Sequence, residues 1–328
     1  MPEYRYKQIL EWLYKHNISE YSEIKNLPMP LIKNLENDYP LHSAKIINRQ
    51  ISIDGTRKYL VELSDGALIE SVGIPSEKQK RNSDEPSRLT VCFSTQVGCP
   101  MGCLFCATGM EGFTRNLGAG EIIEQIHLVQ NDFNCRATNI VAMGQGEPFL
   151  NMQATLDALT ILNHKKFDNI GARHITISTC GIPKGIDTLA RDSHQYVLAI
   201  SLHSAIQKSR NTIMPKASKY NLKELRSHIV DYVNKTKRRV TFEYLLINDL
   251  NDDDLHLKAL IEYCTPIHSH VNLLFLNKTM KCDFDPSNAD IALKWQNSLQ
   301  NHGIETSIRS SRGSDINGAC GQLKNSYS

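Results

Sequence analysis

Residues 89–109 read "LTVCFSTQVGCPMGCLFCATG", a strand-like run that leads into a glycine-rich loop with three cysteines. Cys99, Cys103 and Cys106 have the spacing CxxxCxxC, which differs from the paired CxxC or CxxH spacing of most structural zinc sites. Three neighbouring thiolates instead suit an iron–sulfur cluster. Three protein ligands on a four-iron cluster leave one iron open to a substrate or cofactor, as in an open catalytic metal site.

The cysteines could also serve as zinc ligands, disulfide partners or packing residues. A zinc site that takes its fourth ligand from elsewhere stays an alternative. The chain has nine cysteines, an odd number, and its N-terminus lacks a secretion signal, so we expect metal or redox chemistry rather than a disulfide framework. Four cysteines outside the cluster match no pattern and are interpreted as packing residues: Cys135, Cys180, Cys264 and Cys282.

Strand-like runs similar to the one before the cysteine loop recur along the chain, and most are nearly continuous in apolar residues. They read "LTVCFSTQ", "TNIVAMG", "HITIST", "YVLAISL", "RVTFEYLLI", "VNLLFL" and "IETSIR", and helical apolar spacing separates several of them, for example at 122–133 and 222–233. Alternating strands and helices predict an α/β fold with a parallel sheet, as a partial or full β/α barrel. A doubly wound open sheet is the alternative.

Unusual polar motifs follow several of these runs directly. "GQGEP" follows the second run, "STCG" ends the third, "SLHS" ends the fourth and Asn277 follows the sixth. Chemistry in β/α barrels gathers at the C-terminal ends of the strands. We therefore expect these motifs and the cysteine loop to share one rim.

The N-terminal part has a different pattern. Residues 1–45 predict two helices, and "KYLVELSDGALIESVGI" predicts a β-hairpin with its turn at Ser64–Gly66. The polar stretch 75–87 predicts an exposed loop. We expect an accessory region over 1–89, a small helical domain followed by a short β segment, and a catalytic core over 90–328.

Composition sets broad limits on the class of protein. Apolar residues make up 41% and charged residues 22% of the 328 residues, as in folded globular proteins. The sequence contains no run of eighteen apolar residues, so we expect no membrane partner and a cytoplasmic location. The net charge of +2 does not by itself indicate an RNA partner.

Longer motifs resemble the radical S-adenosylmethionine (SAM) RNA adenosine methyltransferases of the RlmN/Cfr type. In chain order they are "CFSTQVGCPMGCLFCATG", "GFTRNLGAGEIIEQI", "MGQGEPFLN", "ISTCGI", "SLHS", "NTIMPKASKYNL", "FEYLLINDLND" and "DINGACGQL". Phe105 fits the aromatic residue common between the second and third cysteines. Gln145 stands where the family usually has Met.

The resemblance implies a role for individual residues. Cys99, Cys103 and Cys106 would hold one [4Fe-4S] cluster. Cys320 would carry the methyl group and Cys92 would be the resolving thiol, while Glu70 would accept a proton from the adenine. SAM contacts are implied for Gly146, Glu147, Ser178, Ser201, Leu202, His203 and Asn277.

The resemblance also implies a reaction that uses two SAM molecules per turnover. The first SAM methylates Cys320; the second, cleaved at the cluster, removes a hydrogen from that methyl group, and the carbon adds to C2 or C8 of an adenosine. The expected substrate is RNA, 23S rRNA first and transfer RNA in some family members. A low-potential electron donor and a thiol reductant for the Cys92–Cys320 disulfide are the further partners, and we expect a monomer.

RNA contacts are expected from Arg115, from the N-terminal helices and from the basic stretch 235–239. Two alternative functions differ in what they require. A radical SAM enzyme with another substrate would not need Cys320. A zinc-stabilised RNA-binding protein would need no catalytic cysteines at all.

Overall fold

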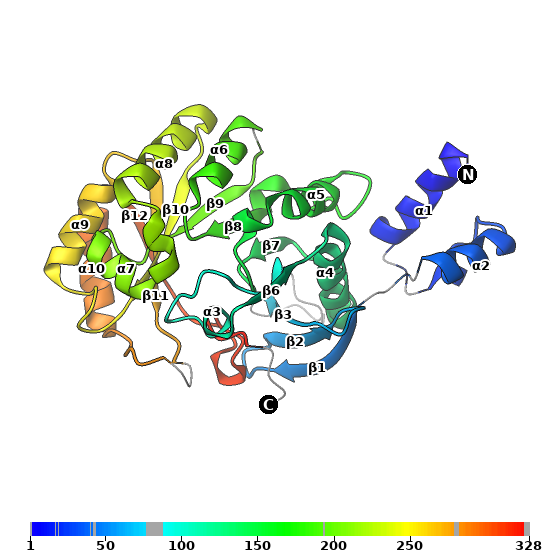
Figure 1. The fold of residues 1–328 in the computed structure, drawn as a ribbon, viewed down its shortest axis with the longest axis horizontal. Helices are drawn as coiled ribbons and strands as arrows, with labels where there is room; N and C mark the ends of the chain where they lie inside the picture. Colours follow the sequence, from blue (N-terminus) through cyan, green and yellow to red (C-terminus); the bar gives the residue numbers. More distant parts are fainter. Residues whose placement is uncertain are drawn as a thin grey trace.

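The structure, a computed structural model, describes residues 2–16, 18, 20–39, 41, 44–76, 88–192, 194–278 and 282–324. A ten-stranded sheet forms its body (Figure 1). Across the sheet the strands are β1 (Lys45–Ile51), β2 (Arg57–Glu62), β3 (Leu68–Pro75), β4 (Leu89–Cys92), β7 (Asn139–Ala142), β8 (Ile175–Thr179), β9 (Val197–Ser201), β10 (Val240–Leu246), β11 (Ser269–Phe275) and β12 (Glu305–Arg309).

The strands from β4 to β12 pair in parallel and in chain order. This order gives crossovers that all run in one direction, so the sheet winds as a barrel and is not doubly wound. Within the described residues, β4 and β12 are not paired with each other, which leaves the barrel partial. All seven predicted core strands are present, and the predicted partial β/α barrel is confirmed.

Helices connect the parallel strands and cover the outer face of the barrel (Figure 1). They are α4 (Ala119–Phe133), α5 (Met152–Asn163), α6 (Pro183–Arg191), α7 (Gln207–Ile213), α8 (Leu222–Thr236), α9 (Asp254–Cys264) and α10 (Ala289–Asn301). Apolar residues at helical spacing, such as Ile122, Ile126 and Val129 of α4, are fully buried against the sheet. Single-turn elements are α3 (Ala107–Glu111), η1 (Tyr21–Glu23), η2 (Pro148–Leu150), η3 (Ala172–His174), η4 (Pro215–Lys219) and η5 (Ser314–Ile316).

Three antiparallel strands extend the barrel sheet beyond β4. The predicted hairpin is confirmed as β2 and β3, and Gly66 in its turn has φ +80°, a conformation that favours glycine. The sequence analysis did not predict β1, whose pairing with β2 is irregular between Ile46 and Asn48. Because β3 pairs with β4, the sheet is continuous across residue 89. The division into two domains at this residue therefore stays a prediction, and residues 77–87 of the predicted loop lie outside the described residues.

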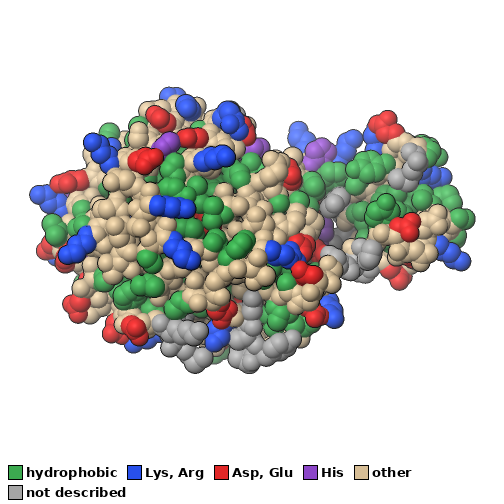
Figure 2. Space-filling view, viewed as in Figure 1, with side chains coloured by type: hydrophobic (Ala, Val, Ile, Leu, Met, Phe, Trp, Pro, Cys, Tyr) green, Lys and Arg blue, Asp and Glu red, His purple; other side chains and the backbone are tan. Residues whose placement is uncertain are grey.

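The N-terminal helices α1 (Glu3–Lys15) and α2 (Met29–Asp38) lie apart from the sheet (Figure 1). Their buried apolar residues form a cluster separate from the barrel core: Ile9, Ile18, Tyr21, Ile24, Leu27 and Ile32. Several large side chains of this region stay exposed, among them Tyr4, Tyr6 and Tyr39, and Figure 2 shows apolar side chains over this part of the surface. No described helix is both long and apolar enough to cross a membrane.

A small second sheet lies beside the barrel. It consists of β5 (Gln96–Gly98) and β6 (Phe113–Asn116), which flank the cysteine loop in the chain. Gly98 has φ +74°, and a Cβ atom there would lie 2.2 Å from the carbonyl oxygen of Gly112. Only glycine fits this close approach, so the backbone begins the cysteine loop with a tight turn.

Candidate active site

The three clustered cysteines lie in the loop between β5 and α3. The backbone N–H of Cys99 donates to Gly112 O at 2.6 Å and that of Cys106 donates to Cys103 O at 3.1 Å. Leu104 N donates to Ile213 O of α7 at 3.0 Å, which fastens the loop to the barrel. Backbone hydrogen bonds therefore hold the loop in place.

The three thiols are half-buried and close enough to affect one another electrostatically. Burial raises the pKa of Cys99 to about 12 and raises the pKa of Cys103 and Cys106 as well. Proximity to Cys106 and Cys99 raises the pKa of Cys103 further. In the described part of the chain, no three His, Cys, Asp or Glu side chains converge on a point where a single ion could bind.

This donor set fits an iron–sulfur cluster better than a zinc ion. A single zinc ion draws its sulfur ligands to about 2.3 Å from one centre, whereas a four-iron cluster binds each thiolate on a different iron. Three soft thiols on one loop, close enough to affect one another electrostatically, suit the second requirement. Cys99, Cys103 and Cys106 are thus the residues that would hold the cluster.

Glu147 lies just behind the cysteine loop. Its side chain is buried, and its two carboxylate oxygens accept backbone N–H groups from Phe149 at 3.0 Å and Cys180 at 2.7 Å. Burial raises the pKa of Glu147, and these hydrogen bonds oppose the increase. Glu147 in turn raises the pKa of Cys99 and Cys103, which places it beside the thiols. A carboxylate in this position suits an ammonium group bound next to a metal cluster.

The glycines before Glu147 bring the backbone close to the cysteine strand. Gly146 has φ +103°, and a Cβ atom there would lie 2.7 Å from Cβ of Gln96. Gln145 between the glycines is buried, and its backbone carbonyl accepts the N–H of Thr95 at 2.8 Å. The departure from the family pattern at Gln145 thus lies inside the packed part of the site.

His203 faces the cysteine loop from the end of β9. Its ring packs edge-on against Phe105, with 4.8 Å between the ring centroids. Its Nδ1 accepts the backbone N–H of Leu245 at 3.1 Å, so Nε2 carries the proton of the neutral ring. Burial, together with the positive charge of Arg210, lowers the pKa of His203 to about 3. His203 can therefore act as a neutral hydrogen-bond donor.

The remaining predicted SAM contacts lie at the same end of the barrel. Ser178 and Ser201 are half-buried near the ends of β8 and β9, and Leu202 is fully buried after β9. Asn277, which follows β11, donates from Nδ2 to the carbonyl oxygen of Cys320 at 3.2 Å. The expectation that these motifs share one rim of the barrel agrees with this placement, while their roles stay predictions.

Cys320 lies in the segment 319–324, which we name the carrier segment. Ala107 N, directly after Cys106, donates to Gly321 O at 2.7 Å, and Thr108 Oγ1 donates to Leu323 O at 2.6 Å. Part of Cys320 is exposed to solvent. The protein atoms around its thiol desolvate it, and this desolvation raises the pKa of Cys320. The carrier segment is therefore anchored on the residues that follow the third cysteine.

Cys92 closes the other side of the carrier segment. It is buried at the end of β4, where it packs with Val72 and Leu323. Burial raises the pKa of Cys92, and Cys320 raises it further, which places the two sulfur atoms near one another. All nine cysteines are free thiols, so no disulfide joins the pair in this structure.

Glu70 also contacts the carrier segment. Its Oε2 accepts the backbone N–H of Lys324 at 2.8 Å, and Lys58 Nζ lies 3.3 Å from its Oε1. Both side chains are buried, Glu70 completely and Lys58 to 4% exposure. From the sequence alone, Glu70 could also be a solvent-exposed residue of the hairpin. Its complete burial excludes that alternative.

Two further buried charged residues border the site, and sequence reasoning missed both. Glu243 of β10 accepts a hydrogen bond from Asn272 at 2.9 Å and raises the pKa of Cys320. Glu243 could have been predicted as a functional residue, because it is an acidic residue inside the apolar run "RVTFEYLLI". Arg210 of α7 is fully buried and donates to the carbonyl oxygens of Leu202, Ala217 and Cys180. Its position among polar residues of a helix gave no comparable signal.

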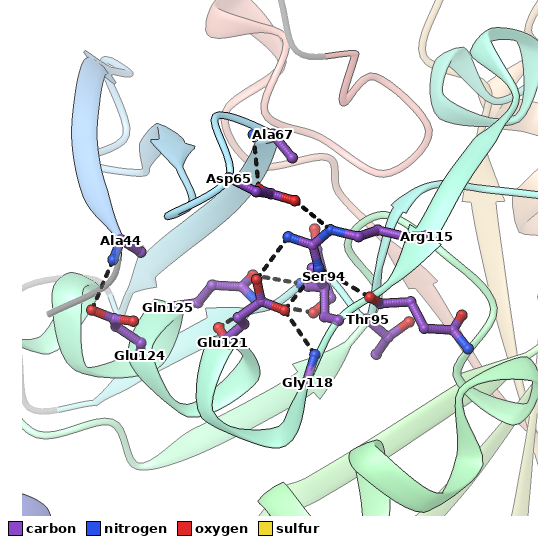
Figure 3. Close-up of polar contacts among 12 residues, drawn as sticks. Ala44, Asp65, Ala67, Ser94, Thr95, Arg115, Gly118, Glu121, Glu124 and Gln125 are labelled. Carbon is purple, nitrogen blue, oxygen red and sulfur yellow. Dashed lines mark hydrogen bonds and ion pairs between the residues drawn. The ribbon is translucent and has the colours of Figure 1, made fainter. Parts of the chain in front are cut away.

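The predicted RNA contacts differ in their surroundings. Figure 3 shows the guanidinium of Arg115 held between Asp65 and Glu121, with distances of 2.8 Å to each carboxylate. Arg115 thus joins the hairpin turn to the first turn of α4. The stretch 235–239 precedes β10 and lies at the end of the strands opposite the cysteine loop. An RNA bound at the rim would reach it only by passing around the body.

Comparisons with known proteins agree with this geometry. A model of the radical SAM superfamily matches residues 93–260. The "Dual-specificity RNA methyltransferase RlmN" of Lawsonia intracellularis is 43% identical over 99% of this chain and 91% of its own length. The chain belongs to the RlmN family of radical SAM methyltransferases. Another RlmN relative, a "Probable dual-specificity RNA methyltransferase RlmN" of Thermotoga neapolitana, is 42% identical over 98% of this chain and 91% of its own.

A solved structure supports the same family at the level of the fold. The radical SAM methyltransferase from Sphaerobacter thermophilus superposes with a TM-score of 0.93, at 39% identity over 99% of this chain and 94% of its own. The predicted enzyme class and cofactors are thereby confirmed: this RlmN family member is a radical SAM methyltransferase with a [4Fe-4S] cluster and SAM.

Proposed function

We propose that this RlmN family member methylates a ring carbon of adenosine, C2 or C8, in RNA, and that Cys320 carries the methyl group. Ribosomal 23S RNA is the proposed substrate, with transfer RNA as a second one because the curated relatives are named dual-specificity enzymes. The placement of Cys320 carries the proposal. The carrier segment is fastened beside Cys106, and Cys320 lies near Cys92 on its other side.

The first step needs Cys320 as a nucleophile. The thiol loses its proton, the thiolate attacks the methyl carbon of SAM, and the carbon–sulfur bond of SAM breaks as the new bond forms. Burial raises the pKa of Cys320, while Arg309 opposes the increase. We therefore expect methyl loading of Cys320 to accelerate as the pH rises, because a larger share of the thiol ionises.

The second step needs a hydrogen atom removed from the methyl group on Cys320. The cluster, with SAM bound, supplies the electron and the radical chemistry for this removal. The chain's residues orient the partners: Glu147 would bind the ammonium group of SAM, and His203 would donate from Nε2. Asn277 donates a hydrogen bond to the backbone carbonyl of Cys320, which restrains the backbone at the residue that would carry the methyl group.

The last step releases the product. The carbon bound to Cys320 becomes attached to the adenine ring, and the unpaired electron of this adduct leaves it, for which the oxidised cluster would be the acceptor. Glu70 accepts the proton from that ring carbon, and the Cys92 thiolate attacks the sulfur of Cys320. An S–S bond forms as the carbon–sulfur bond breaks, and the methylated ring takes up a proton. A thiol reductant must then restore the two thiols, and a low-potential electron donor must serve the cluster.

A Cys92→Ala variant tests the assignment. It can load Cys320 and form the RNA adduct but cannot resolve it, so the protein purified from cells should carry RNA on Cys320. Nuclease digestion and mass spectrometry of the tryptic peptide then identify the nucleotide and the modified carbon. Cys135→Ala is the matched control, because Cys135 lies near the end of α4 and outside the site.

The outcomes separate the candidate functions. An adduct on Cys320 in the Cys92 variant, and none in the control, supports the proposal. Cys92→Ala protein that is free of RNA and retains SAM cleavage would point instead to a radical SAM enzyme with another substrate.

A further inference from the structure

A buried ion pair lies behind the carrier segment, and its cation, Lys58, has no role in the steps above. Lys58 and Glu70 stand on neighbouring strands β2 and β3, where Glu70 is paired with Leu60 and Lys58 with Val72. Their side chains project from the same face of the sheet, with 3.3 Å between Nζ and Oε1. Both side chains are almost completely removed from solvent.

Burying a lone charge is unfavourable, so a charged group in this position needs an opposite charge or strong hydrogen bonds. Lys58 and Glu70 satisfy this need for each other. Glu70 also accepts the N–H of Lys324, and a hydrogen bond to a carboxylate favours its ionised form. Both contacts therefore favour a negative Glu70, a state in which it can accept a proton.

Other titratable groups also lie near this face, among them Arg309, whose positive charge acts on Cys92 and Cys320. Cys92 of β4 lies on the same face, and Cys320 lies in the carrier segment beyond it. Burial raises the pKa of both thiols, so near neutral pH they are uncharged. Lys324 contacts Glu70 through its backbone, and its side chain is half-buried. Among the described residues, Lys58 is the cation that lies 3.3 Å from the Glu70 carboxylate.

We infer that Lys58 is a positioning residue that holds Glu70 as a carboxylate at the carrier segment, ready to accept the proton of the adenine ring carbon. This inference rests on the proposed function, in which Glu70 is the proton acceptor. When Glu70 takes the proton, the C–H bonding electrons stay on the ring. The transferred proton adds one positive charge to the pair.

The test compares four proteins: wild type, Lys58→Met, Lys58→Arg and Glu70→Gln. Each is reconstituted with its cluster, loaded with a methyl group on Cys320, and mixed with the RNA substrate in a single turnover at a series of pH values. The first readout is methyl loading of Cys320, measured by mass spectrometry. The second is the rate of methyladenosine formation as a function of pH.

We expect Lys58→Met to load Cys320 like wild type but to form product about tenfold more slowly at the acidic end. Its rate should recover toward wild type as the pH rises, because Glu70 then ionises without help. Lys58→Arg keeps the charge and should keep the wild-type profile. A purely structural role of Lys58 would instead lower the rate by the same factor at every pH, and this result would overturn the inference.

Glu70→Gln separates the inference from the proposed function. Loss of product at every pH in this variant supports Glu70 as the proton acceptor. Full activity of Glu70→Gln would refute that role, and the inference with it, whereas an inactive Glu70→Gln beside a uniformly slowed Lys58→Met would refute the inference alone. Should Lys58→Met not fold, Lys58→Gln, which retains a hydrogen-bond donor without charge, takes its place under the same criteria.

Discussion

His203 combines a strained backbone with a buried ring. Its φ of +55° lies in the left-handed region, which residues other than glycine seldom adopt. Its side chain is 4% exposed, faces Phe105 and accepts the N–H of Leu245. Strained residues that persist in a packed environment are concentrated at functional sites. The strained backbone after β9 thus lowers the stability of the fold while it positions one neutral imidazole ring.

Protonation of His203 predicts part of the pH dependence of stability. The pKa of His203 is about 3 in the folded chain, and about 6.5 when unfolded. Between these two pH values the unfolded chain binds a proton at His203 that the folded chain does not. The contribution of His203 to the free energy of unfolding is therefore fully present above about pH 6.5 and is lost as the pH falls. From pH 7 to pH 5 we expect this residue alone to reduce the free energy of unfolding by about 2 kcal/mol.

Urea unfolding of wild type and His203→Asn at the two pH values measures this effect. Asparagine tolerates the left-handed backbone and does not titrate, so the variant should be less sensitive to pH by that amount. Equal pH sensitivity of the two proteins would show that His203 is not held neutral by the fold.

The partners of buried charged residues could not be predicted from the sequence. The role of Glu70 could be predicted from the resemblance of its motif, but its partner Lys58 could not. The two meet only because the hairpin register places them on one face of the sheet. A register of this kind depends on the turn and on the pairing with β1 and β4, which one strand's sequence does not determine.

At the scale of elements, the parallel strands were predictable because most of them are short apolar runs that are largely buried, as in β9 and β10. β1 was not, since "KIINRQI" lacks a regular alternation and its pairing is irregular between Ile46 and Asn48. The cysteine loop and the motifs at the strand ends could be assigned to one rim from topology alone. The anchoring of the carrier segment on residues 107 and 108 could not, because it joins positions more than two hundred residues apart.

The loop between β7 and η2 gives a prediction at this scale. In Gly146→Ala, the new Cβ atom would lie 2.7 Å from Gln96 Cβ at a φ of +103°. We expect a loss of about 2 kcal/mol of stability, or a shifted loop with weakened SAM binding. Thermal unfolding and calorimetric SAM titration measure the two quantities. Gly120→Ala is the control, because nothing lies within 4 Å of its Cβ position in α4; equal behaviour of the two variants would contradict the prediction.

At the scale of the whole molecule, the N-terminal helices and the barrel are packed separately. The apolar residues of α1, η1 and α2 form their own cluster, while the barrel core forms another. Charged side chains of both signs are interspersed over the body in Figure 2, with no face of a single sign in this view. Exposed tyrosines on the helices, Tyr4 and Tyr6 at 56% and 54% exposure, can stack on unpaired bases.

Removal of residues 1–41 should therefore affect RNA binding without affecting methyl loading of Cys320. We expect the shortened protein to retain methyl loading of Cys320, because no residue of the site lies in that region. Its affinity for the RNA substrate should fall about tenfold or more, as expected from the loss of base stacking. Filter binding and peptide mass spectrometry report the two results. Unchanged RNA affinity would assign RNA contact to the barrel alone.

The antiparallel extension has a consequence for the chain in a crowded solution. A partial barrel that ended at β4 would offer a row of unpaired backbone groups to a neighbouring molecule. Here β1 takes the outer place, and it is irregular and charged: Lys45 pairs with Glu62, and Arg49 pairs with Asp132. Strand-to-strand assembly is discouraged at that border. Strand β1 thus gives the sheet a border at which edge-to-edge aggregation of newly made copies of the enzyme is disfavoured.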